Sequence, residues 1–118
     1  MTLLLETILW TQGIYFLATG MWPLVHYGSF EAITGHKTDV WLVKTVGMLL
    51  AVTGAALLIA VMDRRPVDAF TFTIGAGTAL GLLTIDIIYV VKKVISKIYL
   101  LDACVQLLLI ALWCINIF

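Results

Sequence analysis

Charged side chains are scarce in this chain, and the few that are present balance in sign. Of its 118 residues, 12% are charged, seven of them basic and seven acidic, whereas 63% are hydrophobic. Soluble domains carry about 25% charged residues, so this composition excludes an ordinary water-soluble domain. The balanced charge, with no extended basic patch, also argues against a nucleic-acid partner.

Cysteine is almost as scarce, and the usual cofactor motifs are missing. The two cysteines, Cys104 and Cys114, fall on one predicted helix, about 15 Å apart along its axis, which is too far for a disulfide. No metal-type Cys/His spacing, phosphate loop or dinucleotide motif occurs. We therefore expect no metal and no cofactor, and we interpret the cysteines as apolar packing residues.

Long apolar runs occupy most of the chain instead. About 20 helical residues cross the ~30 Å hydrocarbon core of a bilayer, and four runs reach this length, at about 3–25, 40–62, 69–91 and 98–118. They are about twice as long as a membrane-spanning strand and do not alternate strictly. The sequence predicts an all-α polytopic membrane protein, in which residues 1–118 form a single domain, an antiparallel bundle of four transmembrane helices.

The first run differs from a secretion signal, because no basic residue precedes it and Glu6 lies within its start. We therefore expect it to be retained as a span. The longest connector, 26–39, follows it. Ser29 can cap a short helical turn that Gly35 ends, with Phe30 and Ile33 on one face. This pattern predicts a short interfacial helix or lid between spans one and two.

Basic residues are distributed unevenly between the two ends of the predicted bundle. One end holds Lys37, Lys44, Lys92, Lys93 and Lys97, and the end with both termini holds Arg64 and Arg65. The positive-inside rule then predicts that both termini lie outside the cytoplasm. Membrane lipids are the expected surroundings, and the lysine-rich end is expected to contact anionic head groups.

Small residues recur every four positions in two of the predicted spans. Gly47, Ala51 and Ala55 form such a stripe in the second span, and Gly77 with Gly81 forms a GxxxG motif in the third. Small residues let helices approach closely in a bilayer. Packing within the bundle is the simpler interpretation, and a homodimer interface is the alternative.

Three charged residues interrupt the apolar runs near one bilayer face. Asp86 lies about 9 Å inside the Lys92 end of the third span, and Lys44 and Asp102 lie about 7.5 Å inside the same face. A charge in hydrocarbon costs about 2.5 kcal/mol or more, so such residues normally face the protein and find a partner. We therefore expect Lys44, Asp86 and Asp102 to meet inside the bundle.

Polar residues at helical spacing extend this layer along three helix faces. Gln106 follows Asp102 at i+4, Tyr89 follows Asp86 at i+3, and His26 ends a polar line that begins at Gln12. If these lines turn inward, they enclose a polar-lined cavity open at the cytoplasmic face. The candidate binding residues are Lys44, Asp86, Asp102, Gln106, Gln12, Tyr89 and His26.

The polar layer has three interpretations. Lys44 bridging the two carboxylates could act only as an electrostatic staple that sets helix register. The layer could instead be a ligand-binding or catalytic pocket, or part of an ion or proton path. Two carboxylates sharing one lysine would suit acid/base chemistry as readily as proton coupling.

Four spans in 118 residues, with Lys/Asp pairs at the helix ends, resemble the DoxX-like group of small bacterial membrane proteins. Segments 37–44 (KTDVWLVK) and 99–103 (YLLDA) lie near two of these helix ends. This resemblance in architecture implies the bacterial inner membrane and assigns no active site. The chain is also similar in size to small multidrug-resistance exporters. Those carry an essential glutamate near the middle of the first span, where this chain has Gln12, with Glu6 near the start.

Three functional classes therefore remain. The first is a lipid-binding, amphiphile-binding or accessory membrane protein, which the lack of a catalytic motif favours. The second is a small intramembrane enzyme acting on a lipid-like substrate, with Asp86 and Asp102 as acid/base candidates. The third is a dimeric proton-coupled transporter that uses the same carboxylates. The sequence does not decide whether the protein is an enzyme.

Overall fold

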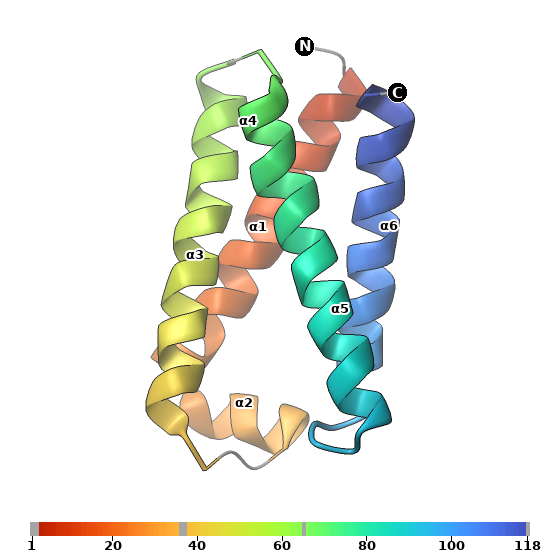
Figure 1. The fold of residues 1–118 in the computed structure, drawn as a ribbon. Coiled ribbons are helices and arrows are strands. Elements are labelled where there is room, and N and C mark those ends of the chain that lie inside the picture. The colour runs from red at the N-terminus through yellow and green to blue at the C-terminus, as the bar shows by residue number, and fades with distance from the viewer. Residues whose placement is uncertain (1–2, 36–37, 65, 118) are drawn as a thin grey trace.

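The computed structural model describes residues 3–35, 38–64 and 66–117, and all regular elements within them are helices. In chain order they are α1 (Leu3–Val25), α2 (Tyr27–Thr34), α3 (Val40–Met62), α4 (Ala69–Phe72), the π-helix η1 (Thr73–Gly77), α5 (Thr78–Val91) and α6 (Tyr99–Ile117). The elements α4, η1 and α5 are consecutive and form one continuous rod. α1, α3, this rod and α6 run lengthwise, with both termini at one end and α2 across the other (Figure 1).

Three helices among the described residues are long and apolar enough to cross a membrane: Val40–Met62, Ala69–Val91 and Tyr99–Asn116. Their outward surfaces are apolar too, with Leu49 64%, Val52 60% and Leu108 60% exposed. These findings confirm the all-helical class and its membrane-compatible helices. α1 covers the first predicted span and is equally long, but it is not one of the three, because Glu6, Gln12 and Pro23 make it less apolar.

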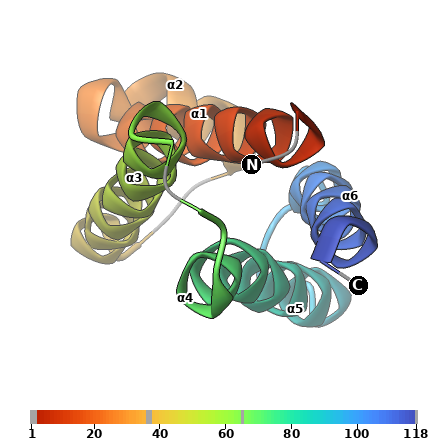
Figure 2. The ribbon, with the colours of Figure 1, turned by 90° about the horizontal axis from the view of Figure 1, so that it is seen from above.

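The four long elements form two closely packed pairs. α1 packs along α3, and α5 packs along α6, whereas contacts between the pairs are fewer. The view from above shows the same pairing, with α1 beside α3 and α5 beside α6 (Figure 2). This arrangement leaves the region between the pairs to be filled by specific side chains.

Glycine permits the closest approach, which is between α1 and α3. A Cβ atom on Gly20 would lie 2.5 Å from the Gly47 carbonyl oxygen, and one on Gly54 would lie 2.5 Å from the Leu17 backbone nitrogen. The predicted stripe is thus correct at Gly47 and Ala51, which are buried here. Ala55, its third member, is half-buried, and the neighbouring Gly54 provides a close contact that was not predicted.

The GxxxG motif of the third predicted span does not pack inside the chain. Both Gly77 and Gly81 are exposed, and a Cβ atom added to Gly81 would meet nothing within 4 Å. The interpretation of this motif as packing within the bundle is therefore wrong. The neighbouring Gly75, inside η1, makes the close contact instead, since its Cβ would lie 2.5 Å from the Trp113 ring.

A chain of buried hydrogen bonds joins the two helix pairs near the termini. Trp113 Nε1 donates to Gln12 Oε1 at 2.7 Å, and Gln12 Nε2 donates to the Gly75 carbonyl oxygen at 2.8 Å. Trp113 and Gln12 are both fully buried. Because Gln12 uses its carbonyl and its amino group, it connects α1 with both α6 and η1.

The predicted short helix in the first connector is present as α2. His26, rather than the predicted Ser29, is its N-cap, and its ring nitrogen accepts from the Ser29 backbone N–H at 3.1 Å. Gly35 ends the helix with a φ of 102°, a left-handed value that favours glycine. His36 and Lys37 of this connector, and Arg65 of the next, lie outside the described residues.

Candidate functional site

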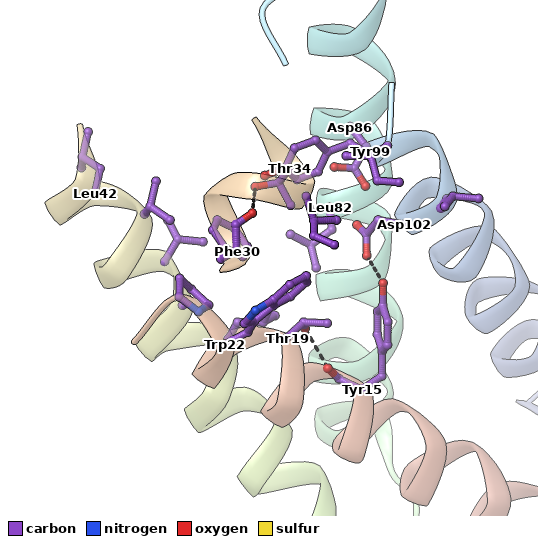
Figure 3. Close-up of a pocket in the computed structure, with 18 residues that line it drawn as sticks. Tyr15, Thr19, Trp22, Phe30, Thr34, Leu42, Leu82, Asp86, Tyr99 and Asp102 are labelled. Carbon is purple, nitrogen blue, oxygen red and sulfur yellow. Dashed lines mark hydrogen bonds between the residues drawn. The ribbon is translucent and has the colours of Figure 1, made fainter. Parts of the chain in front are cut away.

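A cavity of about 580 Å³ separates the two helix pairs near α2. Residues of α1, α2, α3, α5, α6 and the connector before α6 line it. Its walls are mainly apolar, and Val43, Val46 and Leu50 form the α3 side. The expected polar lining is therefore wrong for most of the cavity, where polar groups are restricted to a few positions (Figure 3).

Exposed apolar side chains form part of the cavity wall. Ile33 of α2, Leu42 of α3 and Leu101 of α6 all line the cavity and are 56%, 43% and 65% exposed. Such residues belong both to the cavity and to the outer surface, so the cavity opens to the outside through an apolar rim. An apolar rim suits entry of an apolar molecule better than entry of a water-soluble one.

Two carboxyl groups from different helices meet at this cavity. Asp86 of α5 and Asp102 of α6 both line it, and their carboxyl groups lie within hydrogen-bonding reach of each other. Figure 3 shows them side by side, with Tyr99 next to Asp86. The structure thus brings together the two acidic residues that the sequence placed at one depth.

Hydrogen-bond donors are supplied unequally to these two acids. Tyr15 Oη and Gln106 Nε2 both donate to the same oxygen, Asp102 Oδ1, the second at 3.1 Å. The Tyr15 bond crosses from α1 to α6 and joins the helix pairs a second time. Asp86, by contrast, is only 5% exposed, and its buried Oδ2 has no hydrogen-bond partner.

Lys44 does not join the two acids. Its side chain is exposed, it does not line the cavity, and no ion pair involving it occurs among residues 3–35, 38–64 and 66–117. The expected Lys44 bridge is therefore wrong. Val43 and Val46, the neighbours of Lys44 along α3, line the cavity instead.

The other candidate residues divide between the core and the surface. Gln106 is buried beside Asp102, whereas Gln12 is buried in the Trp113 hydrogen-bond chain. Tyr89 is exposed on α5, with the Lys92 ammonium 5.8 Å from its ring centre. His26 is exposed at the start of α2 and bonds Ser29, so neither Tyr89 nor His26 reaches the acids.

Tyr15 and Thr19 of the cavity wall belong to the polar line predicted along the first span, whereas sequence reasoning missed two further polar residues of the wall, Thr34 and Tyr99. Tyr99 precedes Asp102 by three residues, so helical spacing could have placed both on one face. Thr34 had no comparable signal, because its position depends on how α2 folds across the end of the helix pairs. Its hydroxyl donates to the Phe30 carbonyl oxygen at 2.7 Å.

The geometry limits the chemistry of this site. No group of His, Cys, Asp and Glu suited to a metal ion occurs in the described ranges. The cavity offers an apolar volume, an aromatic pair in Trp22 and Phe30 with ring centres 5.3 Å apart, and two carboxyl groups on one wall. These features can hold an apolar chain and a polar head group at the same time.

A comparison of the chain with protein-family models, curated proteins and solved structures finds no match.

Proposed function

We propose that this chain is a small integral membrane protein that binds a lipid or another small amphiphile between its helix pairs. In this proposal α1, α3, the α4–η1–α5 rod and α6 are four antiparallel spans. α2 lies at the membrane interface as a lid over the cavity. The outer surfaces of the helices are apolar, and both termini lie at the same end of the molecule, as four antiparallel spans require.

One observation carries the proposal: an apolar cavity with an exposed apolar rim has a pair of carboxyl groups on its inner wall. Its volume of about 580 Å³ falls within the roughly 300–1,000 Å³ of small-molecule sites, which combine mostly apolar walls with few polar groups. In a bilayer, the exposed rim residues would contact acyl chains, so a membrane-dissolved molecule could enter without crossing water.

Filling the cavity is expected to prevent this binding. Leu82 of α5 is half-buried and lines the cavity, so Leu82→Trp would place an indole in the space that the ligand needs. We expect the amount of amphiphile that co-purifies with the protein to fall roughly tenfold, equivalent to about 1.4 kcal/mol of binding free energy. Mass spectrometry of solvent extracts, normalised to protein, measures this amount.

Leu80→Trp is the matched control. Leu80 lies on the same helix, is 56% exposed and does not line the cavity, so this variant should retain the co-purifying amphiphile. Comparing thermal unfolding of the two variants separates lost binding from lost folding. Equal retention by Leu82→Trp and Leu80→Trp, in two folded proteins, would contradict a ligand in this cavity.

The orientation and the compartment are proposals as well. The α2 end carries Lys44, Lys92, Lys93 and Lys97 among the described residues, against Arg64 at the other end. The positive-inside rule then supports termini outside the cytoplasm and a cavity near the cytoplasmic face. The resemblance to the DoxX-like group supports a place in a bacterial inner membrane.

Labelling from outside the cell tests this orientation. A membrane-impermeant maleimide should react with Arg64→Cys in intact cells and with Lys97→Cys only after the membrane is opened, because both positions are exposed at opposite ends. The native Cys104 and Cys114 are exposed on the apolar face of α6, so both are changed to serine in the background. The reverse labelling pattern would invert the proposed topology.

The acid pair also supports a second candidate, an intramembrane enzyme acting on a lipid-like substrate. Asp86, Asp102 and the Tyr15 hydroxyl lie together at the cavity, where they could transfer a proton to or from a bound molecule. Turnover of a bound amphiphile in detergent would favour the enzyme. Loss of proton-coupled uptake in Asp86→Asn would favour a transporter, in which the exposed Gly77 and Gly81 face is available for a homodimer.

A further inference from the structure

The carboxyl pair in the cavity has no cationic partner within the described part of the chain. No described lysine, arginine or histidine lines the cavity. Lys44 is exposed on α3, Lys92 lies over the Tyr89 ring, and His26 bonds Ser29. The residues that face the acids are instead Tyr15 from α1, Thr34 from α2 and Tyr99 from α6, whereas α3 contributes only apolar side chains and Gly47.

The acids also have an unmet hydrogen-bond requirement. Tyr15 and Gln106 both donate to Asp102 Oδ1. The Asp86 side chain is only 5% exposed, and its Oδ2 atom has no hydrogen-bond partner. A buried acceptor without a donor costs about 1–3 kcal/mol. A group that brings N–H donors to this wall would remove that cost.

We propose that the ligand's head group is a cationic amine, so that the site selects alkylammonium amphiphiles over neutral or anionic ones. This inference deepens the proposed amphiphile binding and rests on it. An ammonium has three N–H donors and no acceptor, and charge-assisted hydrogen bonds to carboxylates are about twice as strong as neutral ones. Its alkyl chain would lie against Val46, Leu50 and Leu82, toward the open rim.

The aromatic wall suits the same head group. Tyr15 and Tyr99 lie beside the acids, and Trp22 with Phe30 forms an edge-to-face pair farther along the cavity. Aromatic faces attract ammonium groups, most strongly where water is excluded. An anionic head group would meet two carboxyl groups and no cation on this wall, so a carboxylate or phosphate ligand is disfavoured.

Three probes with one chain length test the selection. Radiolabelled dodecylamine, dodecanol and dodecanoate are bound to the protein in nanodiscs of zwitterionic lipid, with empty nanodiscs as the background. We expect saturable dodecylamine binding at least about tenfold tighter than that of either other probe. Asp86→Asn and Asp102→Asn should abolish the preference for dodecylamine over dodecanol.

Asp39→Asn is the control for the change in charge. Asp39 is exposed at the same end of the molecule, makes no side-chain cap hydrogen bond and does not line the cavity, so its variant should keep the preference for the amine. Dodecanol or dodecanoate binding as tightly as dodecylamine would overturn the cationic head group and leave amphiphile binding intact. Absence of saturable binding for all three probes would overturn the proposed function itself. The comparison of the three probes uses the unaltered chain, so its result remains valid even if an acid variant fails to fold.

Discussion

Gly20→Ala is expected to be, together with Gly54→Ala, among the most destabilising changes of a single methyl group in this protein. The new Cβ would lie 2.5 Å from the Gly47 carbonyl oxygen and 2.6 Å from the Ala51 backbone nitrogen. These are backbone atoms, so no side-chain rotation relieves the overlap and α1 must move away from α3. Overpacking typically costs about 1–3 kcal/mol, and we expect at least this loss in the free energy of unfolding in detergent.

Gly81→Ala is the matched control for Gly20→Ala. Gly81 is also helical, but nothing lies within 4 Å of its added Cβ. Alanine is preferred to glycine in a helix interior by roughly 0.5–1 kcal/mol, so Gly81→Ala should leave stability unchanged or raise it slightly. If both variants unfold at the parental temperature, the close packing of α1 against α3 is incorrect. If Gly81→Ala alone changes the mass of the detergent complex, the exposed face serves in a homodimer.

Gln12→Leu should give the second largest loss of stability. The substitution removes the acceptor of the fully buried Trp113 N–H and the donor that reaches the Gly75 carbonyl oxygen. A buried donor left unpaired costs about 1–3 kcal/mol, although bonds between membrane helices average about 0.6 kcal/mol in one well-studied case. We therefore expect a loss of about 1–3 kcal/mol, measured by unfolding in detergent with tryptophan fluorescence.

Asn116→Leu provides the comparison for Gln12→Leu. Asn116 makes only a local bond, from Nδ2 to the Leu112 carbonyl oxygen one turn earlier, so its replacement should change stability by no more than about 0.5 kcal/mol. Adding Trp113→Phe to Gln12→Leu removes the orphaned N–H and should cost less than Trp113→Phe in the parent. Purely additive effects would show that the two side chains are not coupled.

The two stability predictions test different contacts, one within a helix pair and one between the two pairs. The glycines hold α1 to α3 within a helix pair, whereas Gln12 holds this pair to α6 and η1. The Gln12 connection lies toward the termini, and the cavity lies toward α2. Tyr15 and Asp102 form the connection nearest to the cavity.

Helix boundaries followed closely from the sequence. The runs predicted at 3–25, 40–62 and 69–91 coincide with α1, α3 and the α4–η1–α5 rod, and α6 begins one residue after the expected 98. Hydrophobicity and length decide where a chain can be helical in a bilayer, and neighbouring residues carry that signal. The π-helix within the rod was not predicted, because no local pattern distinguishes it from a continuous α-helix.

The sequence predicted how far along each helix the candidate residues lie, but not which face of each helix turns inward. Asp86 and Asp102 were expected at one level and do meet, since each lies on the inward face of its helix. Lys44 lies at the same expected level, yet its side chain is exposed, because the packing of Gly47 and Gly54 against α1 leaves Val43 and Val46 on the cavity side of α3. Counting residues gives the position along a helix axis, whereas contacts with a partner helix set which face turns inward.

By itself, the chain's order of residues determined that the protein is helical, where its long helices begin and end, and that two acids share one level. Only the tertiary structure decided that Lys44 stays outside, that α2 brings Thr34 to the cavity, and that the cavity is mainly apolar. The physical reason is that the length and hydrophobicity of one helix are local properties of its residues. A cavity exists between helices, and its walls depend on how closely each pair of neighbours can approach.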